Sequence, residues 1–195
     1  VLHLGGAETV SIDLANALAK RGVEVAYSAA PGPLDTRLGE GVGYEETPPL
    51  RAATIPRFLR RFSTVLRSFK PDVVHAQGAT LALAARGFSR IGGQRIAIVL
   101  THHSTGYSRA PKFLTGPLLR ASCDQIIAIS SAKYLQFKKL GFAEARVSFI
   151  PNFVDCRAIQ NAATHTDREH LRRELQIPDS AVVVAMIGRM IPGKG

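Results

Sequence analysis

The sequence predicts an α/β fold, with a Rossmann-like parallel sheet covered by helices on both faces. Short apolar runs alternate with helical patterns of about 10–15 residues, which indicates successive β-α-β units. The runs are continuously apolar rather than alternating, as in DVVHA (72–76), IAIVL (96–100) and QIIAI (125–129). Such runs are typical of strands covered on both faces. A chain of 195 residues, 46% of them hydrophobic, can bury such a core without a disulfide or a metal.

The expected elements of the N-terminal half follow one another from the first residue. Residues 1–4 are apolar and run into Gly5-Gly6, which predicts the end of a strand and a tight turn into a helix over about residues 7–20. Gly22 then stands where a glycine commonly ends a helix. The elements expected next are strands at 23–28, 42–45, 72–76 and 96–101, and helices at 54–69 and 80–90.

The same alternation continues as far as Pro151. The elements expected there are helices at 112–121 and 132–140, and strands at 125–130 and 146–150. The chain then becomes polar and charged, with one helix near 167–175 that Thr166 and Glu169 can cap. The apolar run AVVVAMI (181–187) predicts a further strand.

This change of composition divides the chain into three parts. We expect a first domain over residues 1–155, a linker over 156–180 and, over 181–195, the first strand and loop of a second, truncated α/β domain. Cys123 and Cys156 match no metal or disulfide spacing and suit a reducing cytoplasm. No apolar run approaches the ~18 residues of a membrane span. Whether a signal peptide precedes Val1 stays an open question.

The charge is strongly basic and partly concentrated in one helix. There are 25 Lys and Arg against 15 Asp and Glu, a formal net charge of +10, which suits acidic partners. Six of the basic residues and no acid lie between Arg51 and Lys70. The helix at 54–69 also has an apolar face, and two interpretations follow. We favour packing of this face on the sheet beneath solvated arginines over a helix that lies on an anionic membrane, but the basic face at 51–70 can attract lipid head groups even then. Nucleic-acid binding is not predicted, because this single helix lacks the interleaved aromatic residues or the known module expected of a nucleic-acid-binding protein.

Candidate site residues gather where strands are expected to end. Ligands of an open parallel sheet bind beyond the carboxyl ends of its strands. Gly5-Gly6 lie there, at a helix N-terminus that favours anions. Four of the six histidines also fall at predicted strand ends, and these are His3, His75, His102 and His103. They could bind a metal, act as acid or base, or hydrogen-bond a polar ligand. No metal-binding spacing accompanies them, so a metal is not predicted.

A second candidate site is the glycine-rich loop GRMIPGKG at 188–195. Arg189 can make bidentate contacts with a diphosphate, and Lys194 adds a point charge. The loop is not a P-loop, because Gly195 stands where Ser or Thr would follow the lysine. The alternative is a solvated turn.

Several segments in order resemble glycosyltransferase family 4. They are GGAETVSIDLANALAKRGVEV, KPDVVHAQG, LTHHSTG, DQIIAISSA, LGFAEARVSFIPNFVD and GRMIPGKG. The resemblance implies a retaining transferase of GT-B fold, in which two Rossmann-like domains face each other across a cleft. Residues 1–155 would then be the acceptor-side domain and 181–195 the start of the nucleotide-sugar-binding domain.

The resemblance also implies roles for individual residues. His103, in a T-x-H segment that begins at Thr101, would face the reacting sugar, while Arg189 and Lys194 would neutralise the donor diphosphate; these three are the expected catalytic residues. The expected donor- or acceptor-binding residues are Gly5, Gly6, Glu8, His102, Ser130 and Asn152, with Asp155 in the same turn as Asn152.

The expected function is transfer of a sugar from a nucleotide-diphosphate donor to a glycan or lipid, in the cytoplasm or at the inner face of the membrane. No cofactor or metal is implied, because fixed cations take the metal's place. The family's E-x7-E segment belongs after residue 195, so a chain that ends there is expected to be inactive by itself. Three alternatives stay open: a nucleotide-sugar epimerase of the same fold, a non-catalytic acceptor- or membrane-binding module, and a metal-dependent hydrolase built on His3, His75 and His103.

Overall fold

The computed structural model describes residues 5–103, 112–164 and 167–185, with the side chains of 112–115 and 164 left aside. Two compact units divide the chain, Val1–Phe153 and Val154–Gly195. The strand expected at residues 1–4 and the glycine-rich loop at 188–195 lie outside the described residues.

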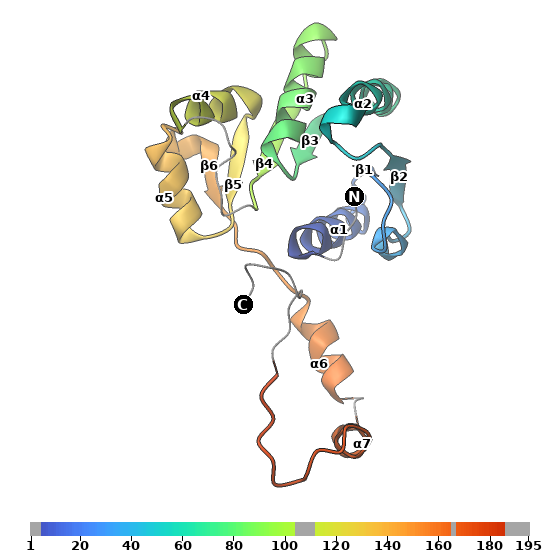
Figure 1. The fold of residues 1–195 in the computed structure, drawn as a ribbon. Helices are drawn as coiled ribbons and strands as arrows, with labels where there is room; N and C mark the ends of the chain where they lie inside the picture. Colours follow the sequence, from blue (N-terminus) through green and yellow to red (C-terminus); the bar gives the residue numbers. More distant parts are fainter. Residues whose placement is uncertain (1–4, 104–111, 165–166, 186–195) are drawn as a thin grey trace. The chain divides into compact units, whose positions relative to one another are not determined.

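The first unit alternates helices and strands as predicted (Figure 1). Its helices are α1 (Gly6–Ala19), α2 (Ile55–Phe69), α3 (Ala79–Ile91), α4 (Lys112–Ser122) and α5 (Ser131–Lys139). Its strands are β1 (Val25–Ala29), β2 (Val42–Glu46), β3 (Val73–Ala76), β4 (Ala97–Thr101), β5 (Gln125–Ala128) and β6 (Val147–Phe149). Short 3₁₀ turns occupy Asp35–Arg37, Ala52–Thr54 and Glu144–Arg146. The observed bounds differ from the predicted ones by at most two residues, which is the usual uncertainty of helix and strand ends.

All strand pairs among the described residues are parallel. β1 pairs with β2, and β3, β4, β5 and β6 form a four-stranded sheet in sequence order. This order follows from β-α-β units in which each helix returns the chain to the next position along the sheet. Helices lie on both faces (Figure 1). Ile98, Leu100 and Ile126 consequently have no exposed surface, which confirms that the central strands are covered on both sides.

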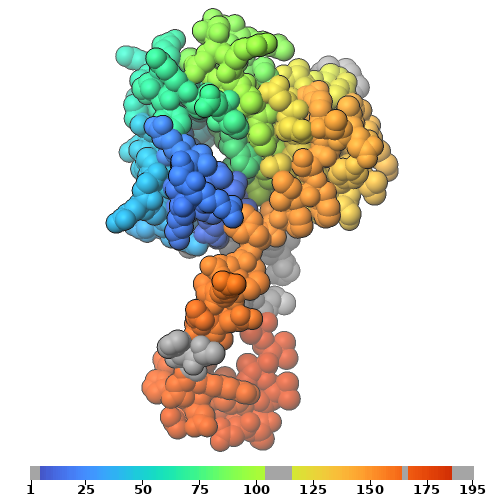
Figure 2. All heavy atoms as spheres, turned by 180° about the vertical axis from the view of Figure 1, so that it is seen from behind, coloured from blue at the N-terminus to red at the C-terminus, as the bar shows by residue number. Residues whose placement is uncertain are grey.

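The basic helix α2 buries its apolar face in the core. Phe58, Phe62 and Leu66 are at most 8% exposed, and the Phe58 and Phe62 rings stack with centroids 5.4 Å apart. The arginines lie on the outer side of α2, which Figure 2 shows in teal at the molecular surface. The interpretation that the apolar face packs on the sheet is therefore confirmed.

The second unit contains a helix that the sequence analysis missed. Residues 156–164, at the start of the expected linker, form α6 (Cys156–Thr164). The Asp155 carboxylate accepts a hydrogen bond from the Ala158 amide at 3.0 Å and so caps this helix, although the resemblance suggested a role in a turn. A capping aspartate before a helix-compatible segment was the signal that could have revealed α6.

The second helix of this unit, α7 (Arg168–Glu174), lies within the predicted range but has a different cap. The Asp167 carboxylate accepts from the His170 amide at 2.9 Å, whereas the expected cap residue Thr166 lies outside the described residues. Residues 181–185 carry no strand, and Val182 and Val184 are each 91% exposed. An extended segment becomes a strand only when another segment pairs with it, and no described residue pairs with this one. Among the described helices, none combines the length and apolarity that a bilayer crossing requires.

Candidate functional site

The carboxyl ends of β3 and β4 bring four polar side chains into two hydrogen-bonded pairs. His75 Nε2 lies 2.7 Å from Thr101 Oγ1, and His103 Nε2 lies 2.9 Å from Gln77 Oε1. The register explains both pairs. Ala76 is the Cα partner of Leu100, so the residues that follow them, Gln77 and Thr101, point to the same face of the sheet. His75 lies two residues before Gln77 and His103 lies two residues after Thr101, so these two side chains also point to that face. In each pair, the residue on the β3 side contacts the residue two positions beyond its register partner on the β4 side.

Burial makes both histidines of this cluster poor bases. It lowers the pKa of His75, and the neighbouring His103 lowers it further by charge repulsion. Burial also lowers the pKa of His103, while the Glu8 carboxylate on α1 opposes that shift. The two imidazoles are therefore neutral at pH 7, and Glu8 lies close enough to act on His103 electrostatically.

These shifts predict that the fold loses stability in mild acid. The unfolded state binds protons at a pKa of ~6.5, above the lowered values of the folded state, so unfolding takes up protons. We expect the free energy of unfolding to be constant above pH ~6.5 and to fall below it. Urea titrations between pH 7.5 and 5 measure this slope. His75→Asn should flatten it, whereas Gln160→Asn, at an exposed position on α6, should leave it unchanged. An equal slope in all three proteins would contradict the assignment.

The N-terminus of α1 supplies the backbone part of the site. Gly5 is the N-cap residue and Gly6 begins the helix. The Glu8 side chain folds back over Gly5, because a Cβ added to Gly5 would lie 2.3 Å from Glu8 Oε2. A Cβ on Gly6 would meet no atom within 4 Å, so the space beside the first turn is open. The first amides of a helix have no partner within the helix, so a helix N-terminus of this kind favours an anionic ligand.

The two neighbouring histidines after β4 face different elements. His102 presents its ring to Phe137 of α5 in an edge contact with centroids 6.3 Å apart, whereas His103 faces Gln77 after β3. Successive residues of an extended chain point to opposite sides, which accounts for the divergence. Ser130 is the N-cap of α5, and its hydroxyl accepts from the Lys133 amide at 3.3 Å.

The predicted site residues that remain are Asn152, His3, Arg189 and Lys194. Asn152 is exposed near the end of the first unit. His3, Arg189 and Lys194 lie outside the described residues. Within the described ranges, no three His, Cys, Asp or Glu side chains are placed to hold a metal ion. Gln77 was missed by the sequence analysis, although its position two residues after His75 puts it on the same face of the strand.

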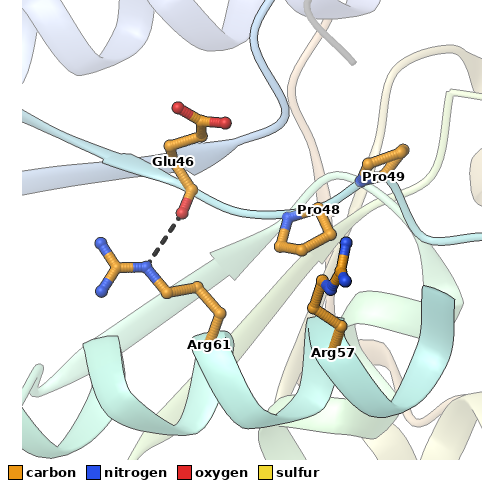
Figure 3. A pocket seen from close by; sticks show the side chains of 5 residues that line it. All are labelled: Glu46, Pro48, Pro49, Arg57 and Arg61. Carbon is orange, nitrogen blue, oxygen red and sulfur yellow. Dashed lines mark hydrogen bonds between the residues drawn. The ribbon is translucent and has the colours of Figure 1, made fainter.

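A separate hollow lies between the end of β2 and α2 (Figure 3). Pro48 and Pro49 form one side of the hollow, and Arg57 and Arg61 rise toward it from α2 (Figure 3). Arg61 is held in place, because its Nε donates to the Glu46 carbonyl at 3.0 Å and its Nη2 lies 2.8 Å from a Glu45 carboxylate oxygen.

Comparison with solved structures places the first unit in a known fold. The Anabaena protein Alr3699/HepE, solved with UDP and glucose, is 18% identical, with a TM-score of 0.65; the match covers 90% of this chain and 48% of that protein. The lipopolysaccharide outer core galactosyltransferase WaaB is 19% identical over 80% of this chain and 44% of its own, with a TM-score of 0.61. A glycosyltransferase from Rickettsia africae is 16% identical over 92% and 48%, with a TM-score of 0.68.

The chain therefore spans about half the length of these solved structures and has the architecture of the N-terminal half of a GT-B fold. Curated protein sequences gave no match. The family model described as Glycosyltransferase Family 4 matches residues 4–158 of the 195, which includes every element of the strand-end cluster. By this match, the chain belongs to glycosyltransferase family 4.

Proposed function

We propose that the protein transfers a sugar from a nucleoside-diphosphate donor to a glycan or lipid acceptor, with retention of anomeric configuration. This proposal is carried by the His103 imidazole, which Gln77 contacts after β3 and which the Glu8 carboxylate in the first turn of α1 reaches electrostatically. The family match over residues 4–158 includes all of these elements. The solved structures of Alr3699/HepE with UDP, with UDP and glucose, and with UDP-glucose support a nucleotide-sugar donor.

Each part of the site has a role in this reaction. The amides of Gly6 and its neighbours stabilise negative charge, because they point outward at a helix N-terminus. His103 contacts the donor sugar. Arg189 and Lys194 stabilise the charge that grows on the leaving diphosphate as the glycosidic bond breaks. Such fixed cations leave no step that requires a metal or a cofactor.

The deciding experiment incubates the full-length protein with UDP-glucose and other nucleotide sugars, with and without glycan and lipid acceptors. Acceptor-dependent release of the nucleoside diphosphate supports the transferase. Proton NMR of the first-formed product gives its anomeric configuration, and an inverted product would reject retention. Conversion of the donor sugar without an acceptor would favour an epimerase of the same fold. The absence of both reactions would favour a binding module.

We further propose that α2 holds the protein against an anionic membrane surface on the cytoplasmic side. Arg57 and Arg60 are exposed on α2, and Ile55 and Leu59 beside them are 42% and 44% exposed despite being apolar. Arginines attract lipid head groups, while apolar side chains between them can enter the interface. The free cysteines Cys123 and Cys156 suit the reducing compartment.

Removing two of these arginines is expected to weaken membrane binding. Each is worth about 1 kcal/mol near an anionic surface, so Arg57→Ala with Arg60→Ala should lower the partition coefficient roughly 30-fold. Co-sedimentation with phosphatidylserine-containing vesicles measures it, and added salt should weaken binding of the unmodified protein. The matched control is Arg168→Ala with Arg173→Ala, which removes the same charge from α7. Equal binding to uncharged vesicles would contradict the proposal.

A further inference from the structure

Gln77 is one of the side chains of the strand-end cluster that the reaction above leaves without a role, and it is the one that contacts His103. It follows β3 directly and precedes Gly78, the N-cap of α3, so its backbone lies between two regular elements. Its Oε1 meets His103 Nε2 at 2.9 Å. A glutamine that contacts an imidazole from a rigid position can determine which ring nitrogen carries the proton.

The chemistry of the two atoms gives the direction of this hydrogen bond. An amide oxygen can only accept, so His103 Nε2 must donate. A neutral imidazole has a single N–H, and here Gln77 takes it. Nδ1 of His103 is then left as a lone-pair acceptor. A neutral His103 in this state can accept a hydrogen bond from a hydroxyl group.

We propose that Gln77 is a positioning residue that holds His103 in the Nε2–H tautomer, so that Nδ1 is offered as an acceptor to a hydroxyl of the donor sugar. This proposal rests on the proposed glycosyl transfer for the identity of the ligand. The tautomer itself is a property of the protein and can be measured without any substrate.

The neighbours of His103 support the neutral form that this arrangement needs. His75 lies close enough for the two rings to repel each other when charged, and its own Nε2 is engaged by Thr101. Burial lowers the pKa of His103 although Glu8 opposes the shift. Among the described residues, the titratable groups that face His103 are His75 from β3, which is itself neutral, and Glu8 from α1. Burial outweighs the opposing effect of Glu8 on the pKa of His103, so the neutral ring prevails at pH 7.

The first test is ¹⁵N NMR of the histidine rings in the ligand-free protein at pH 7.5. His103 should show a protonated Nε2 and an unprotonated Nδ1. Gln77→Leu removes the acceptor, so the Nε2–H signal should give way to a mixture of tautomers. A thermal melt by circular dichroism verifies that the variant is folded. The matched control is Gln160→Leu at an exposed position on α6, which should leave the His103 signals unchanged. An Nδ1–H tautomer in the unmodified protein, or no change in Gln77→Leu, would overturn the proposal.

A second variant keeps the hydrogen bond and alters only the charge. Gln77→Glu retains an acceptor for Nε2–H but raises the pKa of His103, because a carboxylate favours the imidazolium. Nδ1 is then occupied by a proton at neutral pH and becomes free again as the pH rises. In Gln77→Glu, we expect the pH profile of kcat/KM to shift to higher pH, so that kcat/KM is low at neutral pH and recovers at alkaline pH. In Gln77→Leu, kcat/KM should fall on the order of tenfold at every pH. Identical profiles in the two variants would overturn the positioning role.

The two readouts separate this proposal from the proposed function. If the NMR signals respond as expected but no nucleotide sugar is turned over, the tautomer assignment stands and the glycosyl transfer fails. If transfer is observed and neither variant alters the His103 signals, the transfer stands and the role of Gln77 is rejected.

Discussion

Arg189→Ala in the full-length protein is expected to lower kcat for donor turnover on the order of 10²–10³-fold, the usual effect of removing one donor that stabilises transition-state charge. The bound diphosphate already carries negative charge, and a further charge develops on it as the glycosidic bond breaks. Under the proposed transfer, the Arg189 guanidinium is expected to stabilise the transition state more than the bound substrate, so kcat should fall more than KM rises. Lys194→Ala is expected to act in the same direction.

The controls for this prediction follow from the charge of the loop. Arg189→Lys keeps the charge but loses the planar fork, so it should recover only part of the rate. Arg168→Ala removes an arginine from the exposed helix α7 and should not affect turnover. Steady-state assays of nucleoside diphosphate release measure all of these rates. Undiminished turnover in both Arg189→Ala and Lys194→Ala would reject the diphosphate role.

Phe137→Ala is expected to destabilise the fold by about 3–5 kcal/mol, as deletion of a large buried ring commonly does. Phe137 is 1% exposed and makes an edge contact with Phe142 at a centroid distance of 5.8 Å. It also contacts the His102 ring beside the candidate site. Since small domains have a total stability of about 5–15 kcal/mol, this loss should be visible as a large drop in the urea midpoint.

Leu135→Ala is the matched control on the same helix. Leu135 is 59% exposed, so its removal should change the free energy of unfolding by no more than about 0.5 kcal/mol. Phe137→Leu should lie between the two, because it keeps part of the buried volume. Equal urea midpoints for Phe137→Ala and Leu135→Ala would contradict the central position of the ring.

Most of the fold could be predicted because it is encoded in local patterns. The apolar run at 96–100 contains Ile98 and Leu100, both fully buried in β4. Gly22 has a φ of +80°, which explains why a glycine follows the end of α1. Helix α6 was missed because the stretch 156–180 that contains it is polar and charged as a whole, and the local signal for its start is the Asp155 cap.

The candidate site could be predicted only as a location. The rule that ligands bind beyond the carboxyl ends of parallel strands led to His75 and His103, and the structure places both in one cluster. The i, i+2 spacing places Gln77 on the face of His75, but it does not reveal that Gln77 meets His103, which lies 26 positions away in the sequence. The alternation of an extended chain separates His102 from His103, but it does not show which of the two faces the cluster.

The sequence by itself determined the order of helices and strands, the burial of the central strands and the edge of the sheet where chemistry is expected. Periodicity and glycine positions are local properties, and they suffice for this. Only the tertiary structure decided which side chains meet at that edge. The register of β3 against β4 pairs His103 with Gln77 and His75 with Thr101, and the packing of α5 draws His102 toward Phe137. Such contacts depend on residues far apart in the chain, whose approach is fixed by the packing of whole elements.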